Sequence, residues 1–171
     1  MKKNELTHIT HTMPAIFKHD CKVLINGSML SPKSREYSLY YGHPHNRFWK
    51  VFCGLWGDDV PETPGEKHDY ALSRNIALWN VIAECDIKGA ADSTIQNVVA
   101  NDMNQVLDNT DVVAIFNLGN KAGELFKKYC EPKLNRDVHV QTLPSTSPAN
   151  AAWKLEDLIE EYEVIRTYVE G

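Results

Sequence analysis

Residues 111–142, DVVAIFNLGNKAGELFKKYCEPKLNRDVHVQT, decide the fold class. The apolar run over 111–116 is typical of a buried strand, whereas residues 121–129 repeat their apolar side chains on one face of a helix. Residues 138–142 indicate a second strand, which Pro144 ends. Strands that alternate with helices predict a parallel sheet that helices cover on both faces.

The remainder of the chain extends this alternation. Residues 76–82 fit a strand or a helix equally well, and residues 61–65 read as a loop. We therefore expect an α/β fold: a single three-layer α/β/α sandwich with a short, mainly parallel central sheet over residues 1–171, of which 1–17 form a mobile N-terminus. The apolar spacing predicts one more strand and three more helices, over residues 22–26, 46–56, 102–108 and 153–169.

The composition is that of one ordinary globular domain. Of the 171 residues, 43% are apolar and 24% are charged, which suffices for a buried core. No apolar run reaches the roughly 18 residues that span a bilayer, and the N-terminus lacks the apolar segment of a signal peptide. Cys21, Cys53, Cys85 and Cys130 form no Cys-x-x-Cys pair, so we expect buried, reduced thiols and no metal site. We expect a cytoplasmic monomer, associated with the nucleoid if the organism is prokaryotic.

Charge is unevenly distributed along the chain. The net charge is −5, but residues 1–56 hold eight Lys and Arg against three Asp and Glu, which leaves −10 for the rest. A basic third can present a positive face to phosphates even on an acidic protein, because affinity depends on local charge placement. An even spread of these charges over a solvated surface accounts for the same numbers equally well.

Two loops carry the chemistry, because ligands of parallel α/β sheets bind beyond the carboxyl ends of the strands. The first loop, residues 27–49, combines glycines that permit close backbone approach with adjacent tyrosines that offer a flat platform for a planar ring. Asn46 in this loop either caps the following helix or turns its amide into the cleft. The second loop, residues 143–150 (LPSTSPAN), sets three hydroxyls between two prolines, which suits either a grip on a phosphodiester or a helix cap.

Together, these loops resemble the motifs of the uracil-DNA glycosylase superfamily. LINGSM (24–29) is similar to its first motif, YYGHPHNRFW (40–49) to the segment that follows, and LPSTSPANA (143–151) to its second motif. The sequence most resembles the branch of DNA-deoxyinosine (hypoxanthine-DNA) glycosylases, the sixth family. The likeness extends over most of the chain, including residues 78–87 and 116–126.

The resemblance implies the fold and the reaction of that superfamily. Such enzymes flip a damaged nucleotide out of the base stack and hydrolyse its N-glycosidic bond. It implies here a monofunctional DNA glycosylase of base-excision repair that acts on deaminated bases, hypoxanthine first and uracil second, and leaves an abasic site. The implied partner is DNA that contains a deaminated base, and no cofactor is needed.

The resemblance also assigns roles to individual residues. Asn46 is implied as the catalytic group: because an amide is no base near neutral pH, it acts by positioning water or by hydrogen-bonding the departing base. Tyr41 is implied as the ring that stacks on the flipped base. The other residues implied to contact the base are Gly27, Ser28, Met29, Gly42, His43 and Ser145, and those implied to contact DNA are Ser31, Lys33, Arg47, Thr146, Ser147, Pro148, Ala149 and Asn150.

Two departures from the motifs keep other functions open. Met29 stands where many relatives carry a polar residue that orients water, and Leu30 stands where the first motif of the branch has proline. The alternatives are a uracil or G·T/G·U mismatch glycosylase, an enzyme that hydrolyses free nucleosides, and a lesion-binding protein that has lost catalysis. Assays with lesion-bearing oligonucleotides and with free inosine distinguish these functions.

Overall fold

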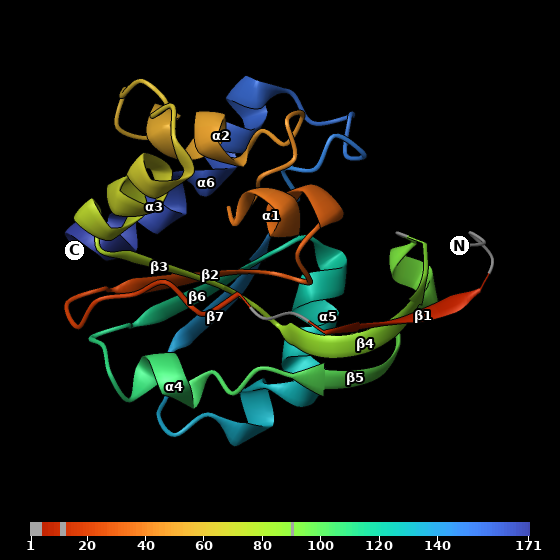
Figure 1. The fold of residues 1–171 in the computed structure, drawn as a ribbon. Coiled ribbons are helices and arrows are strands. Elements are labelled where there is room, and N and C mark those ends of the chain that lie inside the picture. Colours follow the sequence, from red (N-terminus) through yellow and green to blue (C-terminus); the bar gives the residue numbers. More distant parts are fainter. Residues whose placement is uncertain (1–4, 11–12, 90) are drawn as a thin grey trace.

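A parallel sheet of four strands forms the centre of the computed structural model, which describes residues 5–10, 13–89 and 91–171. The strands lie in the order β3-β2-β6-β7, and the two strands of residues 111–142 are parallel neighbours in it. Because all neighbours run parallel, the carboxyl ends of all four strands meet at one edge of the sheet (Figure 1). The strands are β2 (Val23–Gly27), β3 (Ile76–Asn80), β6 (Ala114–Leu118) and β7 (His139–Leu143).

A second, antiparallel sheet lies beside the first and was not predicted. It consists of β1 (Leu6–Thr10), β4 (Ile82–Lys88) and β5 (Gln96–Ala100), in the order β1-β4-β5. Only Val81 separates β3 from β4, so residues 76–82, which the sequence left open, pass from one sheet to the other. Strand β1 lies within residues 1–17, where we expected a mobile N-terminus, and pairs with β4 over its whole length.

Helices cover both faces of the parallel sheet, which gives the predicted three layers (Figure 1). On one face, α6 (Leu155–Glu170) packs against α2 (Phe48–Gly54), and α3 (Pro64–Ser73) packs against β3. On the other face, α5 (Asn120–Tyr129) packs against β6 and β7. Two shorter helices complete the fold, α1 (Pro32–Tyr37) after β2 and α4 (Asn104–Leu107) before β6.

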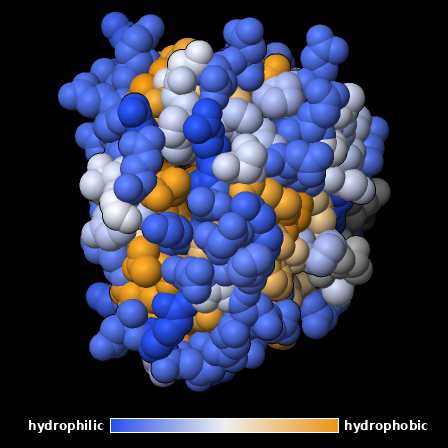
Figure 2. Space-filling model, turned by 90° about the vertical axis from the view of Figure 1, so that its left-hand side faces the viewer, coloured by the Kyte–Doolittle hydropathy of each residue, from blue (hydrophilic) through white to orange (hydrophobic). Residues whose placement is uncertain are grey.

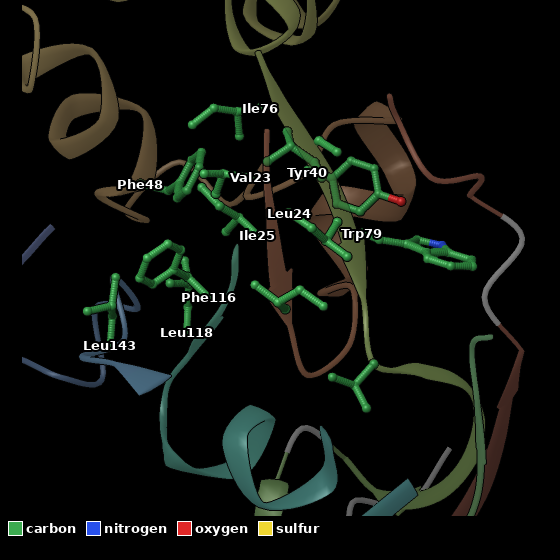
Figure 3. Close-up of a cluster of buried hydrophobic side chains, with 14 of the residues drawn as sticks. Val23, Leu24, Ile25, Tyr40, Phe48, Ile76, Trp79, Phe116, Leu118 and Leu143 are labelled. Carbon is green, nitrogen blue, oxygen red and sulfur yellow. The ribbon is translucent and has the colours of Figure 1, made fainter. Parts of the chain in front are cut away.

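Three of the four parallel strands are buried at every position, which explains their uninterrupted apolar runs. Figure 3 shows side chains of β2, β3 and β6 in one cluster with Tyr40 and Phe48 of the first loop. This packing ties the first loop to the rigid centre of the molecule. All four cysteines are buried and free, as predicted.

Two helices differ from the sequence-based expectation. Helix α3 begins inside residues 61–65, which we expected to be a loop: Thr63 accepts a hydrogen bond from the Glu66 N–H and Pro64 takes the first helical position. Helix α1 begins in the same way, because Ser31 accepts from the Ser34 N–H and Pro32 follows it. Both helices therefore begin with a hydroxyl side chain at the N-cap and a proline at the first helical position. The spacing of apolar residues does not reveal this signal.

The end of the molecule at which the parallel strands begin lies opposite their carboxyl ends. Its surface is mostly hydrophilic with separate hydrophobic patches (Figure 2). Lys18 and Lys22 precede β2 at this end, and Lys18 pairs with Asp20 at 3.1 Å. Lys2 and Lys3 lie outside the described residues. Lys18 and Lys22 therefore lie away from the carboxyl ends of the parallel strands. No helix in the described part of the chain is long and apolar enough to cross a membrane.

Candidate active site

A cleft of about 1060 Å³ opens beyond the carboxyl ends of the parallel strands. The first loop after β2, the second loop after β7 and the turn between β6 and α5 line it, as the rule for parallel sheets predicts. The antiparallel sheet supplies a further wall through Ile9 and Ile87, and Asp92 adds to it from the short 3-10 helix Asp92–Thr94 between β4 and β5. Burial raises the pKa of Asp92, an effect that the nearby Lys121 charge partly offsets.

Asn46 lines the cleft, and its side chain also accepts a hydrogen bond from the first residue of helix α2, of which Arg47 is the N-cap residue. Asn46 therefore contacts both the helix start and the cleft, the two places that the sequence left open. Its Oδ1 accepts hydrogen bonds from the Phe48 N–H at 2.9 Å and from the Thr146 hydroxyl at 2.7 Å. Because a backbone N–H can only donate, these contacts fix which end of the amide is oxygen. The Nδ2 group of Asn46 has no hydrogen-bond partner among the described residues and is left as a donor for a ligand.

Arg47 does not present its guanidinium to the cleft. Its terminal nitrogens donate to the backbone carbonyls of Ser147, Asn150 and Trp153, all on or next to the second loop. Its Nε is buried without a partner among the residues that the structure describes. This side chain therefore holds the second loop against the first, and the contact of Arg47 with DNA stays a prediction.

The two tyrosines of the first loop have separate places. Tyr40 is buried in the core and donates from its hydroxyl to the Pro14 carbonyl at 2.8 Å. Tyr41 lines the cleft, and its ring stacks on Phe48 at 4.0 Å between centroids with 15° between planes. Its φ of 57° is rare for a residue with a side chain and costs conformational energy. Burial raises the pKa of Tyr41 well above its usual range, so the hydroxyl stays protonated.

His43 lines the cleft in a defined tautomer. Its Nδ1 accepts a hydrogen bond from the His45 backbone N–H at 3.1 Å. In the neutral ring the proton must then reside on Nε2, because a nitrogen that accepts cannot carry the hydrogen. His43 therefore offers one N–H donor besides that of Asn46.

The turn after β2 is fixed by its backbone. The Gly27 and Ser28 carbonyls accept from the N–H groups of Val81 and Ile82, each at 3.0 Å. A Cβ at position 27 would lie 3.1 Å from Asn80 Oδ1, so glycine lets the turn approach that amide closely. Met29 lines the cleft, as predicted from the first motif.

Leu30, the departure that follows Met29, is buried in the core at 3% exposure. Its side chain therefore anchors the turn in place of the proline that the branch motif has at this position.

The second loop is tied together by its own side chains. Ser145 Oγ accepts from the Ser147 N–H at 3.1 Å, and Asn150 Nδ2 donates to the Ser145 carbonyl at 3.0 Å. Thr146 is only 1% exposed, and its hydroxyl donates to Asn46. The Thr146 hydroxyl is thus engaged within the protein, and the contact of this residue with DNA stays a prediction. All the predicted residues of this loop line the cleft: Ser145, Thr146, Ser147, Pro148, Ala149 and Asn150.

The cleft is also lined by residues that the sequence did not assign to the site, among them Arg35, Asn80 and Lys121. Asn80 ends β3 and is 4% exposed. Ligands of parallel sheets bind at the carboxyl ends of the strands, so this rule indicates Asn80 once residues 76–80 are known to be a strand.

Of the cations predicted to bind DNA, Lys33 pairs with Glu36 at 3.2 Å and does not line the cleft. Ser31, Ser28 and Gly42 were assigned to the site: Ser31 and Ser28 line the cleft, whereas Gly42 is buried behind it.

Comparison with known proteins gives matches over most of the chain. A hypoxanthine DNA glycosylase of Methanosarcina acetivorans is 32% identical over 146 residues, which are 83% of this chain and 89% of that protein. A hypoxanthine DNA glycosylase of Methanosarcina barkeri is 32% identical over 115 residues, 65% of this chain and 72% of that protein. No family model matches the sequence.

A solved structure matches the fold. The solution NMR structure of a "putative Uracil DNA glycosylase" from Methanosarcina acetivorans gives a TM-score of 0.75 at 26% identity and covers 93% of this chain and 97% of that one. The resemblance predicted from the two loops is thus confirmed by relatives matched over most of their length. The chain belongs to the family of the hypoxanthine DNA glycosylases and has the fold of a uracil-DNA glycosylase.

Proposed function

We propose that this protein is a monofunctional DNA glycosylase that removes hypoxanthine from deoxyinosine in DNA, with uracil as its second substrate. The observation that carries this proposal is the free Nδ2 of Asn46 in a cleft large enough for a flipped nucleotide. The names of the two curated relatives support the choice of hypoxanthine. DNA is accordingly the proposed partner, and the protein acts as a monomer without a cofactor.

The reaction adds water across the N-glycosidic bond. The bond between C1′ and the base breaks, and the base leaves with the electron pair. The water oxygen bonds to C1′, and a water proton ends on the base. Negative charge develops on the base, so a fixed donor that faces it stabilises the transition state. Both acceptor contacts of Asn46 Oδ1 are intramolecular, which supports donation to the base by Nδ2 over orientation of water by Oδ1.

The base is held by rings and donors from three segments. Tyr41, backed by Phe48, is the proposed stacking partner. His43 Nε2–H and the Asn80 amide are proposed to read the edge of the base, and Ser145 faces it from the second loop. The backbone of Gly27, Ser28 and Met29 forms the floor. Hydrogen-bond donors near the base favour hypoxanthine and uracil over adenine and cytosine, because the deaminated bases carry an additional carbonyl.

The DNA backbone is held at the rim of the cleft. Arg35 on α1 and Lys121 at the start of α5 line it from opposite faces of the parallel sheet (Figure 1). Ser147, Pro148, Ala149 and Asn150 provide backbone and hydroxyl contacts from the second loop. Alanine makes a weak wedge, so flipping relies on lesions that already pair poorly.

The test is a panel of end-labelled duplexes and single strands. Each carries one deoxyinosine, deoxyuridine, deoxyxanthosine or mismatched thymine, and alkali reveals abasic sites after incubation. The proposal predicts cutting at deoxyinosine that is faster than at deoxyuridine. Free inosine is the control for a nucleoside hydrolase.

The outcomes separate the alternatives. Cutting only at deoxyuridine or at the mismatch would assign the protein to another substrate of the same superfamily. Salt-sensitive binding of the lesion duplex without cutting would instead indicate a lesion-binding protein and overturn the proposal. Release of hypoxanthine from inosine but not from DNA would indicate a nucleoside hydrolase.

A further inference from the structure

We propose that Thr146 is a positioning residue that holds the Asn46 amide in its catalytic orientation. The inference rests on the proposed function. Thr146 belongs to the second loop, and it acts on the reaction through Asn46, which belongs to the first loop. It assigns to Thr146 a role in the chemical step, besides the DNA contact that the second motif implies.

The contact between the two side chains is short and protected from water. Thr146 Oγ1 donates to Asn46 Oδ1 at 2.7 Å, and Thr146 is 1% exposed. The two residues are separated by 100 positions in the sequence, so no local turn explains their contact. A buried hydroxyl that donates to an amide oxygen exchanges with water only if the loops separate.

The Thr146 hydroxyl is needed to orient the Asn46 amide, because the hydrogen bond from the Phe48 N–H alone does not fix the plane of that amide. A single hydrogen bond leaves the terminal torsion of asparagine broad, since that torsion has no sharp staggered wells. A second donor from another direction restricts the rotation and keeps Nδ2 directed to the cleft. A donor that stabilises a developing charge is effective only when its direction is set before the reaction.

Further contacts hold Thr146 in place. The Arg47 N–H donates to the Thr146 carbonyl at 3.1 Å, and the Arg47 guanidinium binds the carbonyls of Ser147, Asn150 and Trp153. The side chains of two adjacent residues, Asn46 and Arg47, therefore both contact the second loop. The loop that is proposed to meet DNA is thus the loop that orients the catalytic amide.

The experiment compares hydroxyl-free and hydroxyl-bearing variants under single-turnover conditions on a deoxyinosine duplex. Thr146→Val keeps the shape of threonine and removes the donor, and Thr146→Ala is a second hydroxyl-free protein. We expect a rate roughly tenfold lower in both, the effect of one neutral hydrogen bond, with an unchanged Kd for the duplex. Thr146→Ser keeps the donor and is expected to restore the rate to about that of the wild type.

A double-mutant cycle separates positioning from a general structural role. If Thr146 acts through Asn46, then Thr146→Val adds no further loss in the Asn46→Ala protein. Thr110→Val is the matched control, because its hydroxyl donates to the Val106 carbonyl at 2.8 Å away from the cleft. It should keep the wild-type rate.

Three results would overturn the inference: a wild-type rate in Thr146→Val, equal losses in Thr146→Ser and Thr146→Val, or a full additional loss in the Asn46→Ala background. A wild-type protein that cuts no deoxyinosine would instead refute the proposed function itself.

Discussion

At position 42, the chain has no room for a side chain. A Cβ there would lie 2.8 Å from the Leu39 carbonyl oxygen and 3.1 Å from Ser34 Cα, both backbone atoms that cannot move aside cheaply. The Gly42 N–H also donates to Ser34 Oγ at 2.8 Å. Glycine at this position therefore sets the path of the first loop between Tyr41 and His43.

We expect Gly42→Ala to lower the free energy of unfolding by about 1–3 kcal/mol, the usual cost of forcing extra atoms into packed structure. Chemical denaturation measures the difference. Gly65→Ala is the control, because no atom lies within 4 Å of the added Cβ and the site is helical. It should be neutral or stabilising by up to about 1 kcal/mol. Equal losses in both variants would show that packing at position 42 is not the cause.

The antiparallel sheet carries a charged cluster on its outer face. His8 on β1 lies opposite Asp86 on β4, and its ring nitrogens contact Asp86 Oδ1 at 2.9 Å and Glu84 Oε1 at 3.1 Å. Asn97 on β5 donates to the other Asp86 oxygen at 2.8 Å. Since a neutral imidazole has one N–H, both contacts are hydrogen bonds only when His8 is protonated. The hydrogen bonds to Asp86 and Glu84 accordingly raise the pKa of His8.

We expect β1 to be held most firmly in mildly acidic solution. A raised histidine pKa stabilises the folded state below the unfolded value of about 6.5, and this contribution is lost as the pH rises through the folded pKa. The pKa of Asp86 is lowered by Asn97 and His8, so the carboxylate persists to below pH ~4. Hydrogen exchange, corrected for its intrinsic pH dependence, should show more protection of the β1 amides that pair with β4 at about pH 6 than at about pH 8.5. His8→Gln should abolish that difference; equal protection in the wild type would contradict the account.

Elements differ in how far the sequence predicts them. Strands β2, β6 and β7 and the helices α2, α5 and α6 follow from apolar runs and from helical spacing, whereas β3 was left open between strand and helix. Strand β4 does not follow from such patterns, because irregularities in its pairing with β5, between Ile82 and Glu84 and between Glu84 and Asp86, break the two-residue alternation. In β1 the residues alternate between exposed and half-buried, too weak a signal for a strand.

The candidate site divides in the same way. The two motif-bearing loops and Asn46 could be predicted, because their residue types are adjacent in the sequence and resemble a known family. The contact of Thr146 with Asn46 could not, because it joins residues brought together only by the sheet. Asn80 was missed because the strand that it ends was itself ambiguous.

For the molecule as a whole, the affinity for DNA depends more on the charges near the cleft than on the net charge of −5. Arg35 and Lys121 line the cleft, whereas Lys18 and Lys22 lie at the other end of the sheet. Lys121 contacts Glu124 at 3.9 Å and lies near Asp92, and ion pairs of this kind are weak enough for the lysine to exchange its partner for a phosphate. The protein can thus bind a polyanion although its overall charge has the same sign.

We expect Arg35→Gln and Lys121→Gln each to reduce the salt dependence of DNA binding. Each lost phosphate contact lowers the slope of log K against log salt by about 0.9 for duplex DNA. Fluorescence anisotropy with a labelled duplex across a salt series measures the slope. Lys128→Gln removes a charge from the exposed, distant end of the same helix as Lys121 and should leave the slope unchanged. An equal reduction in all three variants would show that the cleft cations are not specific contacts.

The most direct test of the account is the release of free hypoxanthine from a deoxyinosine duplex by the wild type and by Asn46→Ala, with enzyme in excess. We expect release by the wild type and a rate roughly a hundredfold to a thousandfold lower in the variant, the effect of losing one preorganised donor. Duplex affinity should be unchanged. Release by Asn46→Ala at the wild-type rate would contradict the assignment of catalysis to the Asn46 amide.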